Sequence, residues 1–256
     1  MTTPRHEYKE GAPCWVDLAT PDLDGARRFY GALFGWTLDP PSPQFAGYVN
    51  ARIDGEVVAG VMPMPDRPSG WGVWLSTRDI DAATRRLVDA GGTPLMPKHA
   101  VGSLGSMLMA TDAVGATVGL WQPGDHRGSA RFDVHGAMCW HELYTRDGAA
   151  ADRFYRALFG YQQHAVDTDK GFNYAMYDLD GQTVCGRLQM TAAWGDIPAH
   201  WLTYFAVSDL EAALACVRAQ GGKVLHGPTD SPHGPNATVT DPFGAVLAVI
   251  QRPASR

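Results

Sequence analysis

The stretch that decides the fold occurs twice in the chain. Residues 14–36 read CWVDLATPDLDGARRFYGALFGW, and residues 139–161 read CWHELYTRDGAAADRFYRALFGY. The two stretches align without a gap. They share a Cys-Trp start, the runs Arg-Phe-Tyr and Ala-Leu-Phe-Gly, and a final aromatic residue. Because an internal repeat of this kind indicates duplicated structural units, the sequence predicts two similar domains.

The match continues in the same order along the rest of both halves. The matched pairs are Asp54-Gly55 with Asp180-Gly181, 71–83 with 201–213, Gly91-Gly92 with Gly221-Gly222, Thr111-Asp112 with Thr240-Asp241, and Gln122 with Gln251. The stretch between the halves, QPGDHRGSARFDV at 122–134, is polar and contains Gly and Pro, as linkers often do. We therefore predict an N-terminal domain at 1–122, a linker at 123–135 and a C-terminal domain at 136–256.

Each half contains two helix patterns separated by short strand patterns. Asp22 is placed as a helix N-cap, a one-sided apolar stripe follows it, and Gly35 ends it. Asp79, Asp147 and Asp209 open similar stretches. Strands are expected near 13–19, 46–53, 56–64, 71–77, 104–111, 117–122, 138–145, 172–178, 183–190, 201–207, 236–240 and 245–251. This order predicts an α+β fold: four βαβββ modules that form two open cup-shaped sheets backed by helices.

These motifs resemble those of the vicinal oxygen chelate superfamily, which includes glyoxalase I, bleomycin resistance proteins and extradiol dioxygenases. The motifs that carry the resemblance are Phe29-Tyr30 with Leu33-Phe34-Gly35-Trp36, Asp79-Ile80-Asp81-Ala82-Ala83 followed by Gly91-Gly92, and Asp241-Pro242-Phe243-Gly244, together with their twins. The resemblance covers roughly residues 11–122 and 136–252. Within the superfamily, the chain looks most similar to a two-domain actinobacterial subgroup labelled glyoxalase-like or hydroxylase. The resemblance implies a small-molecule cavity in each cup.

The resemblance also implies a divalent metal in each cup, held by side chains from the first strand, the strand before the second helix and the last strand. The corresponding residues are Trp15, Gly72 and Gly119 in the first half, and Trp140, Leu202 and Ala248 in the second. None of these six side chains offers a metal-binding atom. We therefore predict no cofactor at these positions.

Strand alternation predicts which side chains line the cups instead, because every second residue of a strand faces the same way. The expected ligand-binding residues are Trp15, Trp74 and Trp121 in the first cup, and Trp140, Tyr144 and Tyr204 in the second. Aromatic walls of this kind suit flat organic ligands, through stacking and burial of apolar area.

One carboxylate is expected in each cup, Asp17 in the first and Glu142 in the second. A buried carboxylate has a raised pKa and can act as a general acid or base. The alternative is that both residues hydrogen-bond to backbone or an arginine and only shape the cup. His200 is a further catalytic candidate, expected at the rim of the second cup. His141, adjacent to Glu142, is expected on the opposite face of its strand.

Composition narrows the classes of partner. The 256-residue chain has a net charge of −6 and a pI near 5.8, and no basic stripe, which argues against nucleic acid. No apolar run approaches the length of a membrane span, and the N-terminus shows no secretory signal. Four cysteines without a CxxC pair indicate a reduced, cytoplasmic protein. A monomer or homodimer is expected.

Three functions stay open on the sequence. The first is a protein that binds and sequesters a small organic molecule, aromatic or carbonyl-containing, as bleomycin resistance proteins do. The second is a metal-independent enzyme that uses Glu142 or Asp17 for acid–base chemistry. The third is a metal-dependent enzyme of the glyoxalase, dioxygenase or hydroxylase type, with non-standard ligands such as Glu142, His200 and His233. The sequence does not decide whether the protein is an enzyme.

Overall fold

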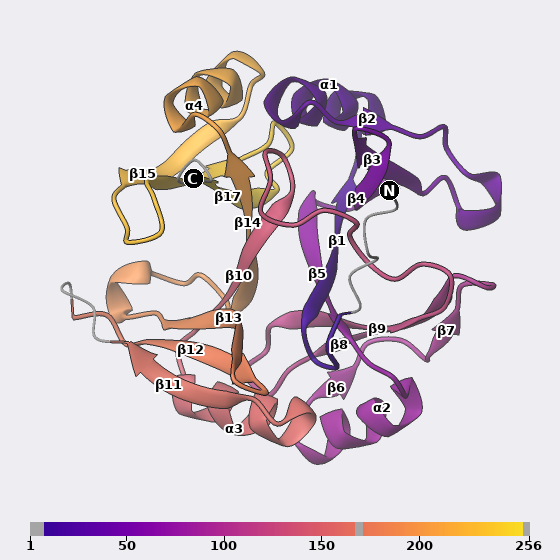
Figure 1. The fold of residues 1–256 in the computed structure, drawn as a ribbon, viewed down its shortest axis with the longest axis vertical. Coiled ribbons are helices and arrows are strands. Elements are labelled where there is room, and N and C mark those ends of the chain that lie inside the picture. The colour runs from indigo at the N-terminus through magenta and orange to yellow at the C-terminus, as the bar shows by residue number, and fades with distance from the viewer. Residues whose placement is uncertain (1–7, 167–170, 253–256) are drawn as a thin grey trace. The chain divides into compact units, whose positions relative to one another are not determined.

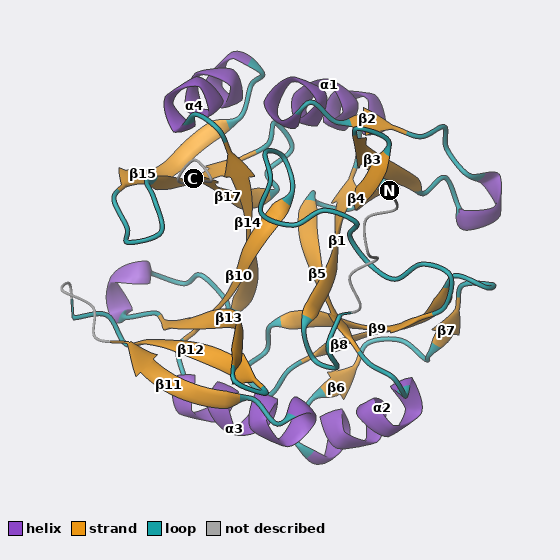
Figure 2. Ribbon diagram, in the orientation of Figure 1, coloured by secondary structure: helices purple, strands orange, loops and turns teal. Residues whose placement is uncertain are grey.

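The computed structural model describes residues 8–166 and 171–252 as strands that alternate with a few helices (Figure 2). The α-helices of these ranges are α1 (Leu23–Phe34), α2 (Ile80–Asp89), α3 (Gly148–Phe159) and α4 (Leu210–Ala219). Two 3₁₀ turns lie at Pro43–Phe45 and Ala192–Trp194. Each α-helix begins after an aspartate whose side chain accepts a backbone N–H of the first turn, as the sequence predicts.

The strands include every one that the sequence predicts, and several more. The first half contains β1 (Pro13–Thr20), β2 (Thr37–Leu38), β3 (Val49–Ile53), β4 (Glu56–Pro63), β5 (Gly70–Ser76), β6 (Thr93–Pro94), β7 (His99–Ala100), β8 (Gly105–Thr111) and β9 (Thr117–Pro123). The second half contains β10 (Met138–Thr145), β11 (Gln162–Val166), β12 (Tyr174–Leu179), β13 (Gln182–Gln189), β14 (His200–Val207), β15 (Lys223–Thr229), β16 (Asn236–Thr240) and β17 (Val246–Gln251).

Packing divides the described chain into two compact units, each of which takes segments from both sequence halves. The first unit consists of Met1–Trp15, Val73–Gly128 and His141–Trp201, as far as the structure describes them. The second consists of Val16–Gly72, Ser129–Trp140 and Leu202–Arg256, with the same limit. Within the first unit α2 packs beside α3, and within the second α1 packs beside α4 (Figure 1).

The strands form one sheet of nine strands and one of eight, backed by the helices. The nine-stranded sheet has the strand order β2-β3-β4-β1-β5-β9-β8-β6, with β7 paired to β8. Its first four strands in this order belong largely to the second unit, and the others belong largely to the first. In the eight-stranded sheet, β11-β12-β13-β10 lie largely in the first unit and β14-β17-β16-β15 in the second. The duplicated α+β architecture of open sheets is confirmed.

Parallel pairing at matched positions sets the register of the two predicted carboxylates. β1 pairs with β4 so that Asp17 lies opposite Gly60. β10 pairs with β13 so that Glu142 lies opposite Gly186. Each carboxylate therefore projects from a strand whose neighbour carries a glycine at the same level.

A repeated tyrosine ties the two sequence halves together inside the first unit. The hydroxyl of Tyr155, on α3, donates to Asp112 Oδ2 at 2.8 Å and accepts from Trp201 Nε1 at 3.0 Å. Asp112 begins the Asp-x-x-Gly turn between β8 and β9, and its Oδ1 accepts the backbone N–H of Ala116 at 2.8 Å. Burial raises the pKa of Asp112 and of Tyr155. These motif residues build the core of the unit.

The second unit repeats the same network with the roles of the halves exchanged. Tyr30, on α1, donates to Asp241 Oδ2 at 3.2 Å, and Trp71 Nε1 donates to the Tyr30 hydroxyl at 3.2 Å. The hydroxyl of Ser69 adds a donor to Asp241 Oδ2 at 3.2 Å. The tyrosine of each Phe-Tyr motif therefore bonds to the aspartate of the Asp-x-x-Gly turn in the other sequence half.

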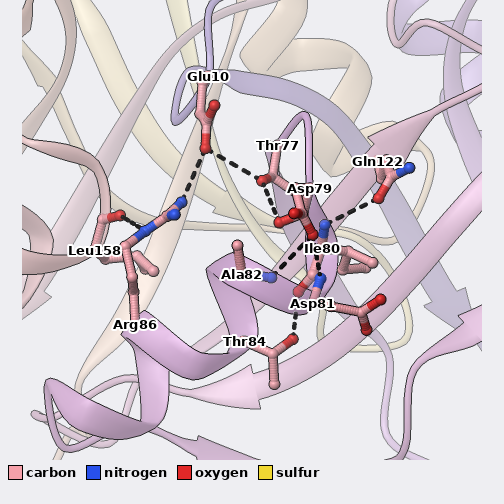
Figure 3. Close-up of polar contacts among 10 residues, drawn as sticks. All are labelled: Glu10, Thr77, Asp79, Ile80, Asp81, Ala82, Thr84, Arg86, Gln122 and Leu158. Atoms are coloured by element: carbon pink, nitrogen blue, oxygen red, sulfur yellow. Dashed lines mark hydrogen bonds and ion pairs between the residues drawn. The ribbon is translucent and has the colours of Figure 1, made fainter.

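The start of α2 shows how polar side chains fix a helix in the first unit (Figure 3). Asp79 Oδ1 accepts the backbone N–H of Ala82 at 2.9 Å. Further along the helix, Arg86 donates to Glu10 at 2.9 Å and to the backbone oxygen of Leu158, near the end of α3, at 2.8 Å. These contacts join the N-terminal segment, α2 and α3, so Glu10 and Arg86 have a structural role.

Two edge strands lie in segments where the sequence predicts no strand. β11 pairs antiparallel with β12, with Gln162 opposite Asp178. Residues 226–236 begin inside β15, which pairs with β16. Both strands lie at a sheet edge, where few side chains are buried, so their sequences lack the alternation that marks half-buried strands. In the described ranges, no helix is long and apolar enough to cross a membrane.

Candidate functional site

Glu142, on β10, is the centre of a group of polar and aromatic side chains in the first unit. Its Oε1 accepts the Tyr174 hydroxyl at 2.8 Å, and its Oε2 accepts the Tyr144 hydroxyl at 3.0 Å. Glu142 is 8% exposed. Two phenol donors therefore hold a nearly buried carboxylate in one orientation.

The two tyrosines reach Glu142 by different routes. Tyr144 lies two residues further along β10, so it shares the face of Glu142. Tyr174 comes from β12, across β13, and its hydroxyl lies over Gly186 so closely that a Cβ at position 186 would overlap it. The absence of a side chain at 186 therefore lets the phenol reach the carboxylate.

His200, the first residue of β14, lies beside this group. Its ring stacks on Tyr144 with centroids 5.2 Å apart and an interplanar angle of 11°, while the ring of Trp194 packs against Tyr144 at 5.5 Å. His200 Nδ1 lies 2.9 Å from the backbone oxygen of Pro198. Because a carbonyl only accepts, Nδ1 carries the proton and Nε2 is the basic nitrogen of the neutral ring. Burial lowers the pKa of His200, which favours this neutral form.

Sequence reasoning missed Tyr174 and its twin, Tyr48. The Tyr48 hydroxyl lies over Gly60, opposite Asp17, just as Tyr174 lies over Gly186. A signal was present, because both tyrosines precede the repeated Asp-Gly turn by the same spacing. The copies differ at the next inward position, where the first half has Ala19 instead of a tyrosine.

In the first half, the predicted ligand-binding tryptophans contact a residue of the chain itself. The His126 ring packs edge-on against Trp15 at 4.4 Å and against Trp121 at 5.5 Å. Trp121 Nε1 donates to the His126 backbone oxygen at 2.9 Å. Trp15 is 4% exposed and Trp121 is 8% exposed. His126, which belongs to the predicted linker, therefore covers these two indoles.

Trp74 lies beside Gly119, one of the positions where the resemblance places a metal ligand. Its indole lies over Gly119, its partner on β9, so that a Cβ at 119 would overlap the ring. Trp74 is 4% exposed, and its Nε1 has no hydrogen-bond partner among the described residues. The ring thus occupies the space beside one of the three positions where the resemblance places a ligand.

The remaining residues singled out from the sequence are Trp140, Tyr204, Asp17 and His141. Trp140 and Tyr204, both half-buried, pack on a cluster of Cys139, Ala206 and Ile250. Asp17 is half-buried on β1. His141 is 1% exposed, and burial lowers its pKa to about 3, so it is a neutral core residue.

The metal implied by the resemblance does not fit the residues present. The six corresponding side chains are indoles, hydrogens or aliphatic groups, none of which binds a metal. Throughout 8–166 and 171–252, no three His, Cys, Asp or Glu side chains form a group that could hold a metal ion. Glu142, His200 and His233 therefore do not form the metal site that the sequence left open.

Comparisons with known proteins define the class. Residues 137–249 match the model of the glyoxalase/bleomycin resistance protein/dioxygenase superfamily, and residues 15–120 match that of a glyoxalase-like domain. The chain belongs to this superfamily.

Two curated relatives span nearly the whole chain. "Putative glyoxylase CFP32" of Mycobacterium tuberculosis is 37% identical over 255 residues, covering 96% of this chain and 97% of the relative. The anthracycline biosynthesis protein DauV of Streptomyces sp. (strain C5) is 34% identical over 262 residues, covering 95% and 94%.

Solved structures share the fold at much lower identity. The 2,3-dioxygenase LapB of Pseudomonas sp. KL28 superposes with a TM-score of 0.65 at 15% identity, covering 95% of this chain and 94% of that one. The Mn(II)-bound glyoxalase of Novosphingobium aromaticivorans has a TM-score of 0.65 at 14% identity, covering 94% and 82%. These likenesses support the architecture alone.

Gly186→Ala should disturb the Glu142 site and the fold together. The added Cβ displaces the Tyr174 hydroxyl from the carboxylate, and we expect a loss of about 1–3 kcal/mol in the free energy of unfolding, measured by urea denaturation. In Gly186→Ala/Tyr174→Phe the overlapping hydroxyl is gone, so the double variant should lose less than the sum of the single losses. Additive losses would show that the hydroxyl does not lie over Gly186.

His126 should make the free energy of unfolding decrease at acidic pH. Burial lowers its pKa to about 4, below the unfolded value near 6.5. The stability from its neutral form is complete above pH 6.5 and is lost as the pH falls toward 4, by roughly 2–3 kcal/mol. His126→Phe keeps a ring on Trp15 and should flatten this limb of the stability–pH curve, whereas His226→Phe, at an exposed position, should not. An unchanged limb in His126→Phe would contradict the buried, neutral assignment.

Proposed function

We propose that this protein binds a small, flat organic molecule with aromatic and carbonyl or hydroxyl groups, and that Glu142 in the second sequence half is its polar anchor. The observation that carries the proposal is the buried carboxylate held by two tyrosine hydroxyls beside stacked aromatic rings. A fixed, buried acceptor flanked by rings gives both orientation and apolar contact to such a ligand.

The ligand class follows from these groups. The partly exposed rings of Trp194 and His200, which pack on the buried Tyr144, offer flat surface, and Glu142 can accept a hydrogen bond from a ligand hydroxyl or enol. The name of the anthracycline biosynthesis relative supports a polycyclic hydroxylated ring system as ligand. In the first half, His126 packs on Trp15 and Trp121, and Ala19 stands at the position of Tyr144, so the proposal places the ligand in the second half.

The same residues support metal-independent proton transfer. Glu142 can take a proton from an acidic hydroxyl or carbon of the ligand, and the Tyr144 and Tyr174 hydroxyls hold its carboxylate in position for that transfer. His200, neutral with Nε2 basic, can take or return a proton beside Tyr144. Sequestration and catalysis therefore share one binding site and differ in whether the ligand is changed. The four free thiols support a reducing location such as the cytoplasm.

Titration with 1,8-dihydroxyanthraquinone tests the proposal. Quenching of tryptophan fluorescence should saturate at one equivalent per chain, with a Kd on the order of 10 μM. Mass spectrometry of the ligand after prolonged incubation separates the two outcomes: an unchanged mass supports sequestration, and a changed mass supports an enzyme. Failure of folded protein to bind either this compound or catechol would overturn the proposal.

A further inference from the structure

Two other rings cover the Tyr144 ring beside Glu142. Tyr144, whose hydroxyl holds Glu142, is 7% exposed, and Glu142 is 8% exposed. The His200 ring stacks on Tyr144, and the Trp194 ring packs against it at an interplanar angle of 57°. A flat ligand can therefore reach the carboxylate only after one of these covering side chains moves.

Trp194 lies in a connection that is longer in the second sequence half than in the first. The connection from β13 to β14 consists of the ten residues 190–199, whereas the matching connection from β4 to β5 consists of the six residues 64–69. The longer connection contains the 3₁₀ turn that ends at Trp194. Residues 64–69, all of which the structure describes, contain no such turn. The ring that covers Tyr144 is therefore carried by a segment that the second half has in addition.

The two connections are also attached differently. In the first half, the Ser69 hydroxyl donates to Oδ2 of the buried Asp241 at 3.2 Å, which ties the short connection to the core. The sequence repeat aligns Ser69 with Ala199, which has no hydroxyl, and Pro21 with Arg146. The second half thus lacks the serine donor and has a guanidinium that the first half lacks.

Arg146 attaches the longer connection. Its guanidinium donates to the backbone oxygens of Thr191 at 3.2 Å, of Gly195, and of Ile197 at 3.3 Å. Arg146 and these three residues are exposed, so water competes for the same donors and acceptors. An attachment of this kind can break and form again without disturbing the core of the unit.

We propose that residues 190–199 form a strap over the Glu142 site, that Arg146 is the positioning residue that holds the strap closed, and that the strap opens to admit the ligand. In the closed state, the strap keeps the Trp194 ring on Tyr144 and shields the carboxylate from water. In the open state, the face of Tyr144 that Trp194 covers becomes available to a flat ring. This role rests on the function proposed for Glu142.

Stopped-flow fluorescence with 1,8-dihydroxyanthraquinone tests the strap. Arg146→Ala should raise the association and dissociation rate constants about tenfold each, because the free and the bound protein both open more often, while the Kd changes by less than about threefold. Arg146→Lys keeps one cationic donor, so its rate constants should lie between those of Arg146→Ala and the wild type. The control Arg153→Ala removes an exposed arginine of α3 in the same unit and should leave both rate constants unchanged.

Hydrogen exchange tests the strap without a ligand. The backbone N–H groups of Trp194 and Gly195 donate to the oxygens of Thr191 and Ala192 at 3.1 and 3.2 Å. In Arg146→Ala these two amides should exchange about tenfold faster, while the amides of β10 exchange as in the wild type.

The two measurements separate failure of the strap from failure of the ligand site. Unchanged exchange at Trp194 and Gly195 in Arg146→Ala overturns the strap, and so does an association rate constant that stays within about twofold of the wild type. If the wild type binds no ligand, the function proposed for Glu142 fails, and the exchange rates alone decide whether Arg146 holds the segment closed.

Discussion

Glu142→Gln should weaken the binding of 1,8-dihydroxyanthraquinone by about 10- to 100-fold. A hydrogen bond to a charged group contributes about 1.5–3 kcal/mol, and each 1.4 kcal/mol is tenfold in affinity. The glutamine retains one oxygen that can accept a tyrosine hydroxyl, and the other hydroxyl can turn to accept the amide. The melting temperature should therefore change little, so that the loss reports on the ligand. Fluorescence titration of both proteins measures it.

The matched control is Asp17→Asn, which removes the carboxylate at the equivalent position of the first half. There the neighbouring inward residue is Ala19, and the tryptophans of that half are covered by His126. We expect affinity within about twofold of the wild type. Equal losses in the two variants, or a loss only in Asp17→Asn, would contradict the placement of the ligand in the second half.

Asp152→Ala should have the largest effect on stability, a loss of about 3–5 kcal/mol in the free energy of unfolding. Asp152 Oδ2 pairs with Arg187 Nη2 at 2.9 Å, and the Arg187 side chain is 3% exposed. The Tyr177 hydroxyl donates to Asp152 Oδ1 at 2.6 Å. Removing the carboxylate leaves the Tyr177 hydroxyl without this acceptor and leaves the buried Arg187 cation without its counter-ion, with only the neutral oxygens of Asn173 as acceptors. Urea denaturation measures the loss.

An exposed ion pair in the matching helix of the first half provides the control. Arg27 and Asp24 are 3.0 Å apart on α1, with 43% and 75% of their side chains exposed. Asp24→Ala should therefore cost less than about 0.5 kcal/mol. Asp152→Asn keeps one acceptor oxygen, so its loss in the free energy of unfolding should lie between those of Asp24→Ala and Asp152→Ala. A cost below about 1 kcal/mol for Asp152→Ala would mean that Arg187 reaches solvent.

The fold was predictable from the sequence because the local patterns that determine it are redundant. The helices with Asp N-caps and the strongly apolar strands occur twice, so each copy checks the other. The edge strands β11 and β15 escaped prediction because an edge strand has too little buried surface to impose alternation. The pairing of Tyr155 with Asp112 was also out of reach, because it joins residues from different repeats.

The candidate site was only partly predictable. Alternation along one strand placed Glu142 and Tyr144 on one face, since it depends on local geometry alone. Tyr174 reaches Glu142 across an intervening strand, which requires knowing that Gly186 leaves room. His126 covers Trp15 from a segment whose composition indicates only a linker. Contacts of this kind depend on tertiary packing, which periodicity does not encode.

A crystal structure of the protein with 1,8-dihydroxyanthraquinone would show whether Glu142 anchors the ligand. We expect a ligand hydroxyl within about 3 Å of a Glu142 oxygen and the ring system packed beside Tyr144 and His200. It is contradicted if the ligand is ordered elsewhere while Glu142 contacts only Tyr144 and Tyr174, or if a metal ion mediates its binding.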